Sequence, residues 1–148
     1  MRTLLIAFAL TAMVAVSPAA AAAPNPKPLA TLFKNPQCGC CETYGEYLRK
    51  NGYEVKVVAT HDLPLIQQRQ GVPAGLEGCH TTLVGGYFVE GHVPVASFGR
   101  LLAERPEVNG ITLPGMPQGS PGMGGPKVEP FTITAVAPGG KQSVYAVE

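Results

Sequence analysis

The stretch LATLFKNPQCGCCETYGEYLRK, residues 29–50, places three cysteines between a predicted strand and a predicted helix. Its first six residues form a short run that is partly β-branched, which favours a strand. The Asn-Pro turn that follows ends this strand. Beyond the cysteines, apolar residues recur at helical spacing as far as the natural stop at Asn51-Gly52. The stretch therefore predicts a strand that delivers a cysteine loop to the N-terminus of a helix.

The rest of the chain continues this alternation of strands and helices. Strands are predicted at residues 53–59, 81–84 and 87–90, and helices at residues 63–70 and 95–104. Asp62 is the predicted N-cap of the first of these helices. Gly85-Gly86 predicts a two-residue hairpin turn. The resulting order, β-α-β-α-β-β-α with cysteines between the first strand and helix, is the layout of a thioredoxin-like α/β fold with a mixed sheet flanked by helices.

The C-terminal part differs in composition. Residues 113–126 form a loop rich in Pro, Gly and Met, and residues 131–137 and 142–147 regain strand character around Pro138-Gly139-Gly140. We expect a C-terminal hairpin that packs back on the domain.

The N-terminus resembles a cleaved secretory signal. Arg2 precedes an apolar run over residues 4–16 and an alanine-rich stretch that ends at Ala23. The run is shorter than the roughly 20 residues that a membrane-spanning helix needs. The sequence therefore predicts a signal peptide over residues 1–22, a single domain over residues 23–148, export, and no membrane span.

The charge balance gives no sign of a polyanionic partner. The chain has 11 Lys and Arg against 10 Asp and Glu, and cleavage of the signal would remove Arg2. No basic run or aromatic platform is present in the sequence, which speaks against nucleic-acid binding.

The four cysteines predict thiolate chemistry. Cys38, Cys40 and Cys41 lie together, and Cys79 stands beside His80. Two structural disulfides fit poorly, because the adjacent Cys40 and Cys41 would each need a separate partner. With about 100 degrees between successive helical residues, Cys38 and Cys41 point to one side, whereas Cys40 and Cys41 diverge. A helix N-terminus favours negative charge, which makes these thiols good ligands or nucleophiles.

Thiolates combined with imidazole select Cu(I), zinc or an iron–sulfur cluster. Zinc could be held by Cys38, Cys41, Cys79 and His80, but Cys40 would then be unused. The spacings do not match those of iron–sulfur proteins. Adjacent, divergent thiolates are easier to satisfy when they bridge different ions, which favours a thiolate-bridged Cu(I) cluster.

Three further side chains have weaker patterns. His92 on its own is more typical of a solvated loop residue or a hydrogen-bond partner at a helix start than of a ligand. Met116 and Met123 lie in the Pro/Gly loop, where thioethers either pack on the domain or bind Cu(I) weakly. His61 carries no such pattern.

The combined motifs resemble the CopG-like periplasmic copper-resistance proteins. They are FKNPQCGCC at residues 33–41, GCHT at 78–81, EGHVP at 90–94 and PGMPQGSPGM at 114–123. The resemblance covers residues 29–145. It implies a thioredoxin-like fold in the periplasm and a cysteine-bridged cluster of several Cu(I) ions. The ligands it implies are Cys38, Cys40, Cys41 and Cys79, supported by His80 and His92.

The resemblance also implies interconversion of Cu(I) and Cu(II), with other periplasmic copper-handling proteins as partners. Whether such redox turnover makes the protein an enzyme stays open. One alternative is a thiol-disulfide oxidoreductase with Cys38 as nucleophile and Cys41 as resolving thiol. The chain lacks the cis-proline that thioredoxins carry before the third strand, which argues against this alternative. The other alternative is a binding module stabilised by zinc or disulfides.

Overall fold

The computed structural model describes residues 27–148, so the predicted signal peptide at residues 1–22 lies outside the described residues. The strands are β1 (Ala30–Lys34), β2 (Val55–Ala59), β3 (His80–Val84), β4 (Tyr87–Glu90), β5 (Gly110–Thr112), β6 (Thr132–Val136) and β7 (Gln142–Val147). The helices are α1 (Gly39–Lys50), α2 (Leu63–Gln70) and α3 (Val95–Glu104), with a 3-10 turn, η1, at Pro138–Gly140. This order confirms the predicted alternation.

All seven strands form one mixed sheet in the order β2-β1-β3-β4-β5-β6-β7. The pairs β1-β2 and β4-β5 are parallel, and the other neighbouring pairs are antiparallel. The Gly85-Gly86 turn joins β3 to β4, as predicted, and β6-β7 is the predicted C-terminal hairpin. The arrangement is a thioredoxin-like α/β fold, extended at one edge by that hairpin.

Strand β5 is the one sheet element that the sequence pattern does not predict. Gly110 pairs with Phe88 of β4 on one side and with Val136 of β6 on the other. Three residues are too few for a periodic signal, so the strand exists because its neighbours pair with it. It connects the C-terminal hairpin to the rest of the sheet.

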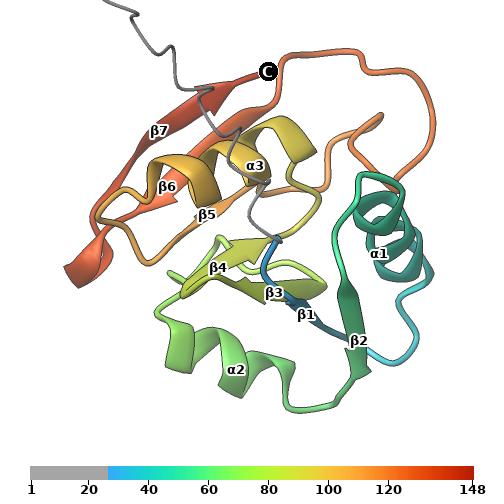
Figure 1. Ribbon diagram of the computed structural model, residues 1–148, viewed down its shortest axis with the longest axis horizontal. Helices are drawn as coiled ribbons and strands as arrows, with labels where there is room; N and C mark the ends of the chain where they lie inside the picture. The colour runs from blue at the N-terminus through green and yellow to red at the C-terminus, as the bar shows by residue number, and fades with distance from the viewer. Residues whose placement is uncertain (1–26) are drawn as a thin grey trace, which may run out of the picture.

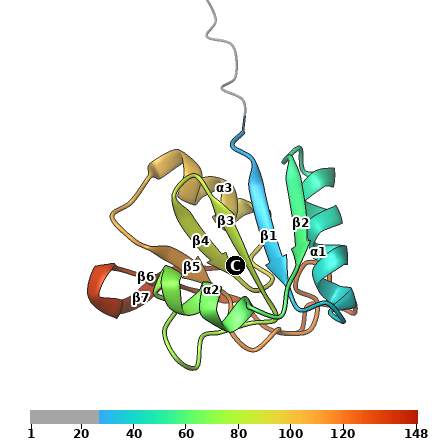
Figure 2. The same cartoon turned by 90° about the horizontal axis from the view of Figure 1, so that it is seen from below.

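The helices cover both faces of the sheet. Helices α1 and α3 lie on one face and α2 on the other (Figure 1), and the view from below shows α2 in front of the strands (Figure 2). The main core lies under α1 and α3, where Leu32, Tyr44, Phe98 and Ile133 are fully buried. Each such side chain contributes about 1.5–3 kcal/mol relative to an exposed one.

The capping of α2 differs from the prediction in one detail. Asp62 occupies the N-cap position, but its side chain makes no capping hydrogen bond. Among the described helices, none is long and apolar enough to cross a membrane.

One hydroxyl in the main core should be dispensable. Thr82 on β3 is fully buried, and its Oγ1 has no hydrogen-bond partner among residues 27–148. An unsatisfied buried polar group costs about 1–3 kcal/mol. We therefore expect Thr82→Val, which keeps the shape and removes the hydroxyl, to raise the free energy of unfolding by about 1 kcal/mol in urea titrations. A loss of stability would show that the hydroxyl has a partner.

Candidate metal centre

Two separate segments bring the cysteines together. Cys38 is the N-cap of α1, and Cys40 and Cys41 occupy its first turn. Cys79 immediately precedes β3, whose His80 pairs with Lys34 at the end of β1. The Asn35 N–H also donates to the Cys79 carbonyl at 3.2 Å. Pairing of β1 with β3 therefore places Cys79 against the cysteine loop.

The four sulfurs form one group. Cys38 and Cys41 are joined by a disulfide, and Cys40 and Cys79 are free. Cys79 Sγ lies 3.2 Å from Cys41 Sγ and 4.0 Å from Cys40 Sγ, while Cys40 Sγ lies 3.4 Å from Cys38 Sγ. All four sulfurs lie within 4.8 Å of one another. Reduction of the disulfide would make all four available as ligands to metal ions.

The predicted divergence of Cys40 from Cys41 is wrong. Cys79 comes from outside the helix, and its sulfur lies 4.0 Å from that of Cys40 and 3.2 Å from that of Cys41, so the two helix cysteines meet at one point. The angle between successive helical residues describes α1 alone, whereas the site is completed by a residue from another segment.

Two buried histidines extend the sulfur group. His80 Nε2 donates to the Gly91 carbonyl at 3.0 Å, which leaves Nδ1 without a proton and 3.8 Å from Cys79 Sγ. His92 Nδ1 donates to the Pro121 carbonyl at 2.7 Å. Its Nε2 is buried and has no partner among the described residues. A carbonyl that fixes one ring nitrogen of a histidine leaves the other free to bind a metal.

The two histidines and Cys79 form a second group of possible ligands. The ligand atoms of Cys79, His80 and His92 lie within 4.8 Å of one another. Of the two alternatives to a ligand role for His92, a solvated loop residue is wrong, because the side chain is fully buried under the loop that carries Pro121 and donates a hydrogen bond to it. Cys79 belongs to both groups and therefore links the sulfurs to the imidazoles.

Burial shifts the protonation of these side chains. It lowers the pKa of His80 to about 3, with a smaller contribution from His92. It also lowers the pKa of His92. Burial, followed by the neighbouring Cys40, raises the pKa of the Cys79 thiol to about 11. At neutral pH both imidazoles are unprotonated and ready to bind, whereas Cys79 must lose a proton to bind a metal.

The Pro/Gly loop contributes a fifth sulfur. Met116 Sδ lies 3.7 Å from Cys79 Sγ, and the side chain is 42% exposed. A shallow depression of about 400 Å³ opens here, lined by Asn35, Gln37, Cys38, Cys40, Cys79 and Met116. Met123 is partly buried in the same loop. The sulfur group is therefore open to solvent on the Met116 side and closed by protein on the histidine side.

Lys34 is a residue of the site that the sequence reasoning missed. Its side chain is buried, and its Nζ donates to the carbonyls of Asn35, Pro36 and Cys38 at 3.1–3.3 Å. It also forms an ion pair with Glu42 at 3.2 Å. A lysine at the end of an otherwise buried strand face was the available signal. Lys34 holds the turn that carries Cys38.

The metal-free protein should show an unusual dependence of stability on pH. The folded state keeps His80 neutral to about pH 3 instead of 6.5, so its contribution is fully present above pH 6.5 and is lost as the pH falls. Burial raises the pKa of Glu90 from 4.5 to about 7, so the corresponding contribution is present below pH 4.5 and is lost as the pH rises through 7. Between pH 4.5 and 6.5 these two contributions to stability change in opposite directions.

The pKa of His92 is lowered as well, so the two histidines outweigh Glu90, and we expect the free energy of unfolding to fall moderately as the pH drops from 6.5 and more steeply below pH 4.5. In Glu90→Gln the opposing change is absent, so the fall between pH 6.5 and 4.5 should be steeper than in the wild type. Urea titrations of both proteins across this range make the test. A flat profile for Glu90→Gln would contradict the assignment.

Comparison with known proteins agrees with this picture. Residues 76–123 match a family model described as a protein of unknown function, DUF411. Two solved structures, "Copper resistance protein copG- Form 2" and "Copper resistance protein copG- Form 1", are each 34% identical to this chain with a TM-score of 0.77. In each comparison the alignment covers 82% of this chain and 98% of the other. A search of curated proteins gave no match.

The family-model match at residues 76–123 contains Cys79, both histidines of the site and the loop that covers His92, whereas Cys38, Cys40 and Cys41 lie before it. The level of identity over almost the full length of the solved proteins is more than a shared fold requires, and it confirms the resemblance that the motifs indicated. The chain belongs to the CopG family of copper resistance proteins.

Proposed function

We propose that this protein binds Cu(I) in a thiolate-bridged cluster and acts in copper resistance. The observation that carries the proposal is the convergence of four cysteine sulfurs within 4.8 Å, with Cys79 shared by a second group that contains two imidazoles. The proposed ligands are Cys38, Cys40, Cys41, Cys79, His80 and His92. Names of the solved relatives, which describe copper resistance proteins, support the choice of metal.

The chemistry of the donors favours Cu(I) over other ions. Thiolates and thioethers are soft ligands that suit Cu(I), and a zinc site of four ligands would leave further sulfurs unused. Two overlapping ligand groups suit several ions better than one ion. Met116 Sδ, exposed beside Cys79, supports an entry point for Cu(I) on that side.

The second part of the proposal is interconversion of Cu(I) and Cu(II). Thiolates stabilise Cu(I), whereas imidazole nitrogens also suit Cu(II), and both kinds of ligand meet at Cys79. Each change of oxidation state moves one electron to or from a separate redox partner. Other copper-handling proteins of the periplasm are the proposed partners.

The proposed location is the periplasm. A signal peptide over residues 1–22 would be removed on export, leaving residues 23–148 as a single metal-binding domain. The names of the relatives, which place them among copper resistance proteins, are compatible with an exported role. N-terminal sequencing of the protein recovered from a periplasmic fraction tests both the location and the cleavage point.

The decisive experiment is Cu(I) loading of the reduced protein without oxygen, in the presence of a competing chelator. We expect more than one Cu(I) per chain, protection of all four cysteines from alkylation, and release of protons because Cys79 is protonated before binding. Loading the form that keeps the Cys38–Cys41 disulfide should bind less copper, because two sulfurs are then unavailable. Zinc offered in the same assay should not displace Cu(I).

The proposal would be contradicted if the reduced protein bound Cu(I) weakly and its cysteines still reacted with the alkylating agent when Cu(I) was in excess. The disulfide favours one alternative, a thiol-disulfide oxidoreductase that uses Cys38 and Cys41. That alternative predicts reduction of insulin by the metal-free protein and loss of this activity in Cys38→Ser.

A further inference from the structure

We propose that Glu90, with Thr81 and Gln67, is a positioning residue that sets the place of Cys79 and His80 in the metal centre. This inference rests on the proposed function and goes beyond it, because none of the three residues belongs to either group of ligands. Their side chains lie on the α2 side of the sheet, opposite the main core under α1 and α3.

The carboxylate of Glu90 binds both ends of the segment that carries the two ligands. Its Oε1 accepts hydrogen bonds from the Gly78 N–H at 2.6 Å and from Gln67 Nε2 at 2.8 Å, and its Oε2 accepts one from Thr81 Oγ1 at 2.6 Å. Gly78 precedes Cys79, and Thr81 follows His80. One fully buried side chain therefore fixes the residues immediately before and after the ligand pair.

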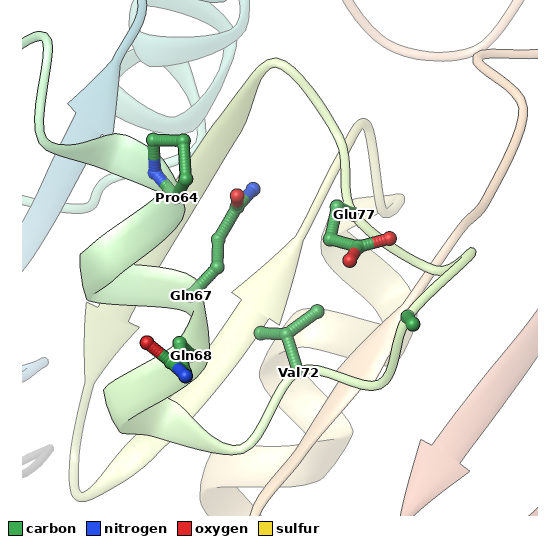
Figure 3. Close-up of a pocket in the computed structure, with 6 residues that line it drawn as sticks. Pro64, Gln67, Gln68, Val72 and Glu77 are labelled. Atoms are coloured by element: carbon green, nitrogen blue, oxygen red, sulfur yellow. The ribbon is translucent and has the colours of Figure 1, made fainter.

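Gln67 completes this clamp, which we define as Gln67, Thr81 and Glu90. Its Nε2 also donates to the Gly78 carbonyl at 3.0 Å, so both polar backbone groups of Gly78 are bound by clamp side chains. Figure 3 shows Gln67 leaving α2 toward the space between this helix and the segment that carries Glu77. The side chain is buried, and it lines a pocket of about 470 Å³.

The fit around Gly78 is close. A Cβ atom at Gly78 would lie 3.1 Å from Glu90 Oε1 and 3.5 Å from the Cα of Gly91. The carboxylate approaches the backbone closely because residue 78 has no side chain. A clamp with such contacts transmits a change in its own geometry directly to Cys79.

Position matters at Cys79 more than at the other cysteines. It is shared by the sulfur group and the group with His80 and His92, so a displaced Cys79 would weaken both. Residues that orient metal ligands typically affect metal affinity by about 10–100-fold when they are replaced. The clamp fits this role because it touches the ligand segment and not the ligand atoms.

Neighbouring threonines on β3 provide a matched pair of variants. Thr81→Val removes a hydrogen bond to Glu90, whereas Thr82→Val removes a hydroxyl that has no partner among the described residues. Gln67→Met removes the other side-chain donor.

Glu90→Gln keeps an oxygen for Gly78 and an amide for Thr81, so it should retain most of the function that Glu90→Ala loses. Ile133→Ala, on β6, is a destabilised control far along the sheet.

The first readout needs no copper. In the reduced, metal-free protein we expect Thr81→Val and Gln67→Met to change the alkylation rate of Cys79 by severalfold, measured by peptide mass spectrometry, while Thr82→Val and Ile133→Ala leave it unchanged. The second readout is Cu(I) affinity, which should fall by about tenfold in the two clamp variants and not in the controls.

The outcomes separate the two proposals. Equal behaviour of Thr81→Val and Thr82→Val in both readouts would overturn the clamp, and so would a change in Ile133→Ala as large as that in Thr81→Val. An altered Cys79 alkylation rate in a protein that holds no Cu(I), even as wild type, would support the clamp and refute the copper function. If Glu90→Ala does not fold, Thr81→Val and Gln67→Met still decide the question.

Discussion

Replacement of Cys79 by serine is expected to weaken Cu(I) binding by more than about 100-fold, because removing a ligand should cost more than removing a residue that orients one. Cys79 Sγ lies 3.2 Å from Cys41 Sγ, and it also lies near His80 and Met116. A serine oxygen is a hard donor and a poor substitute for a thiolate on Cu(I). Competition with a chelator, under anaerobic conditions, measures the change.

The same experiment includes controls for specificity to the site and for loss of the fold. His61→Gln, which alters an exposed histidine outside both ligand groups, should bind Cu(I) as the wild type does. Circular dichroism and urea titration should show that Cys79→Ser is folded. Unchanged Cu(I) affinity in a folded Cys79→Ser protein would remove Cys79 from the site and with it the overlap of the two ligand groups.

The second large effect is expected from Gly122→Ala in the Pro/Gly loop. Gly122 has a φ of +85°, and a Cβ there would lie 2.9 Å from the backbone N of Tyr44 and 3.2 Å from the Cys40 carbonyl oxygen. The conformation costs a side chain about 1–2 kcal/mol and the clash about 1–3 kcal/mol. We expect the free energy of unfolding to fall by about 2–5 kcal/mol in urea titrations.

The site should also loosen in this variant. Pro121, the neighbour of Gly122, accepts the hydrogen bond from His92 Nδ1, so displacement of the loop would free that imidazole. Copper release to a chelator should be faster than in the wild type. Gly124→Ala is the matched control, because Gly124 has a similar φ of +71° and a Cβ there would meet nothing within 4 Å. An equal loss of unfolding free energy in both variants would show that the effect comes from the backbone conformation and not from the contact with α1.

The sequence predicted most of the fold because its signals are local. The strand before the cysteines, the glycine turn at Gly85-Gly86 and the apolar spacing of α3 each lie within a short window. Strand β5 was missed because its three residues are held by pairing with β4 and β6. Pairing between distant segments leaves no mark on so short a stretch.

The candidate site was predicted in composition but not in arrangement. The motifs named the cysteines and histidines, yet the burial of His92 depends on a loop about 30 residues later, through the Pro121 carbonyl. Lys34 and Glu90 were missed for a related reason. A charged residue in a strand looks like a solvated position until the structure shows which backbone groups it binds.

The pairing of β1 with β3 also determines when the site can exist during folding. An unfolded chain offers Cys38, Cys40 and Cys41 together, but Cys79 is 38 residues beyond Cys41 and must first be brought in by loop closure. Contacts of this kind form late because the entropy of the loop is lost before the contact is gained. Excess copper present during refolding would therefore meet three thiols without their fourth partner, so refolding before metal addition should give the higher yield of correctly loaded protein.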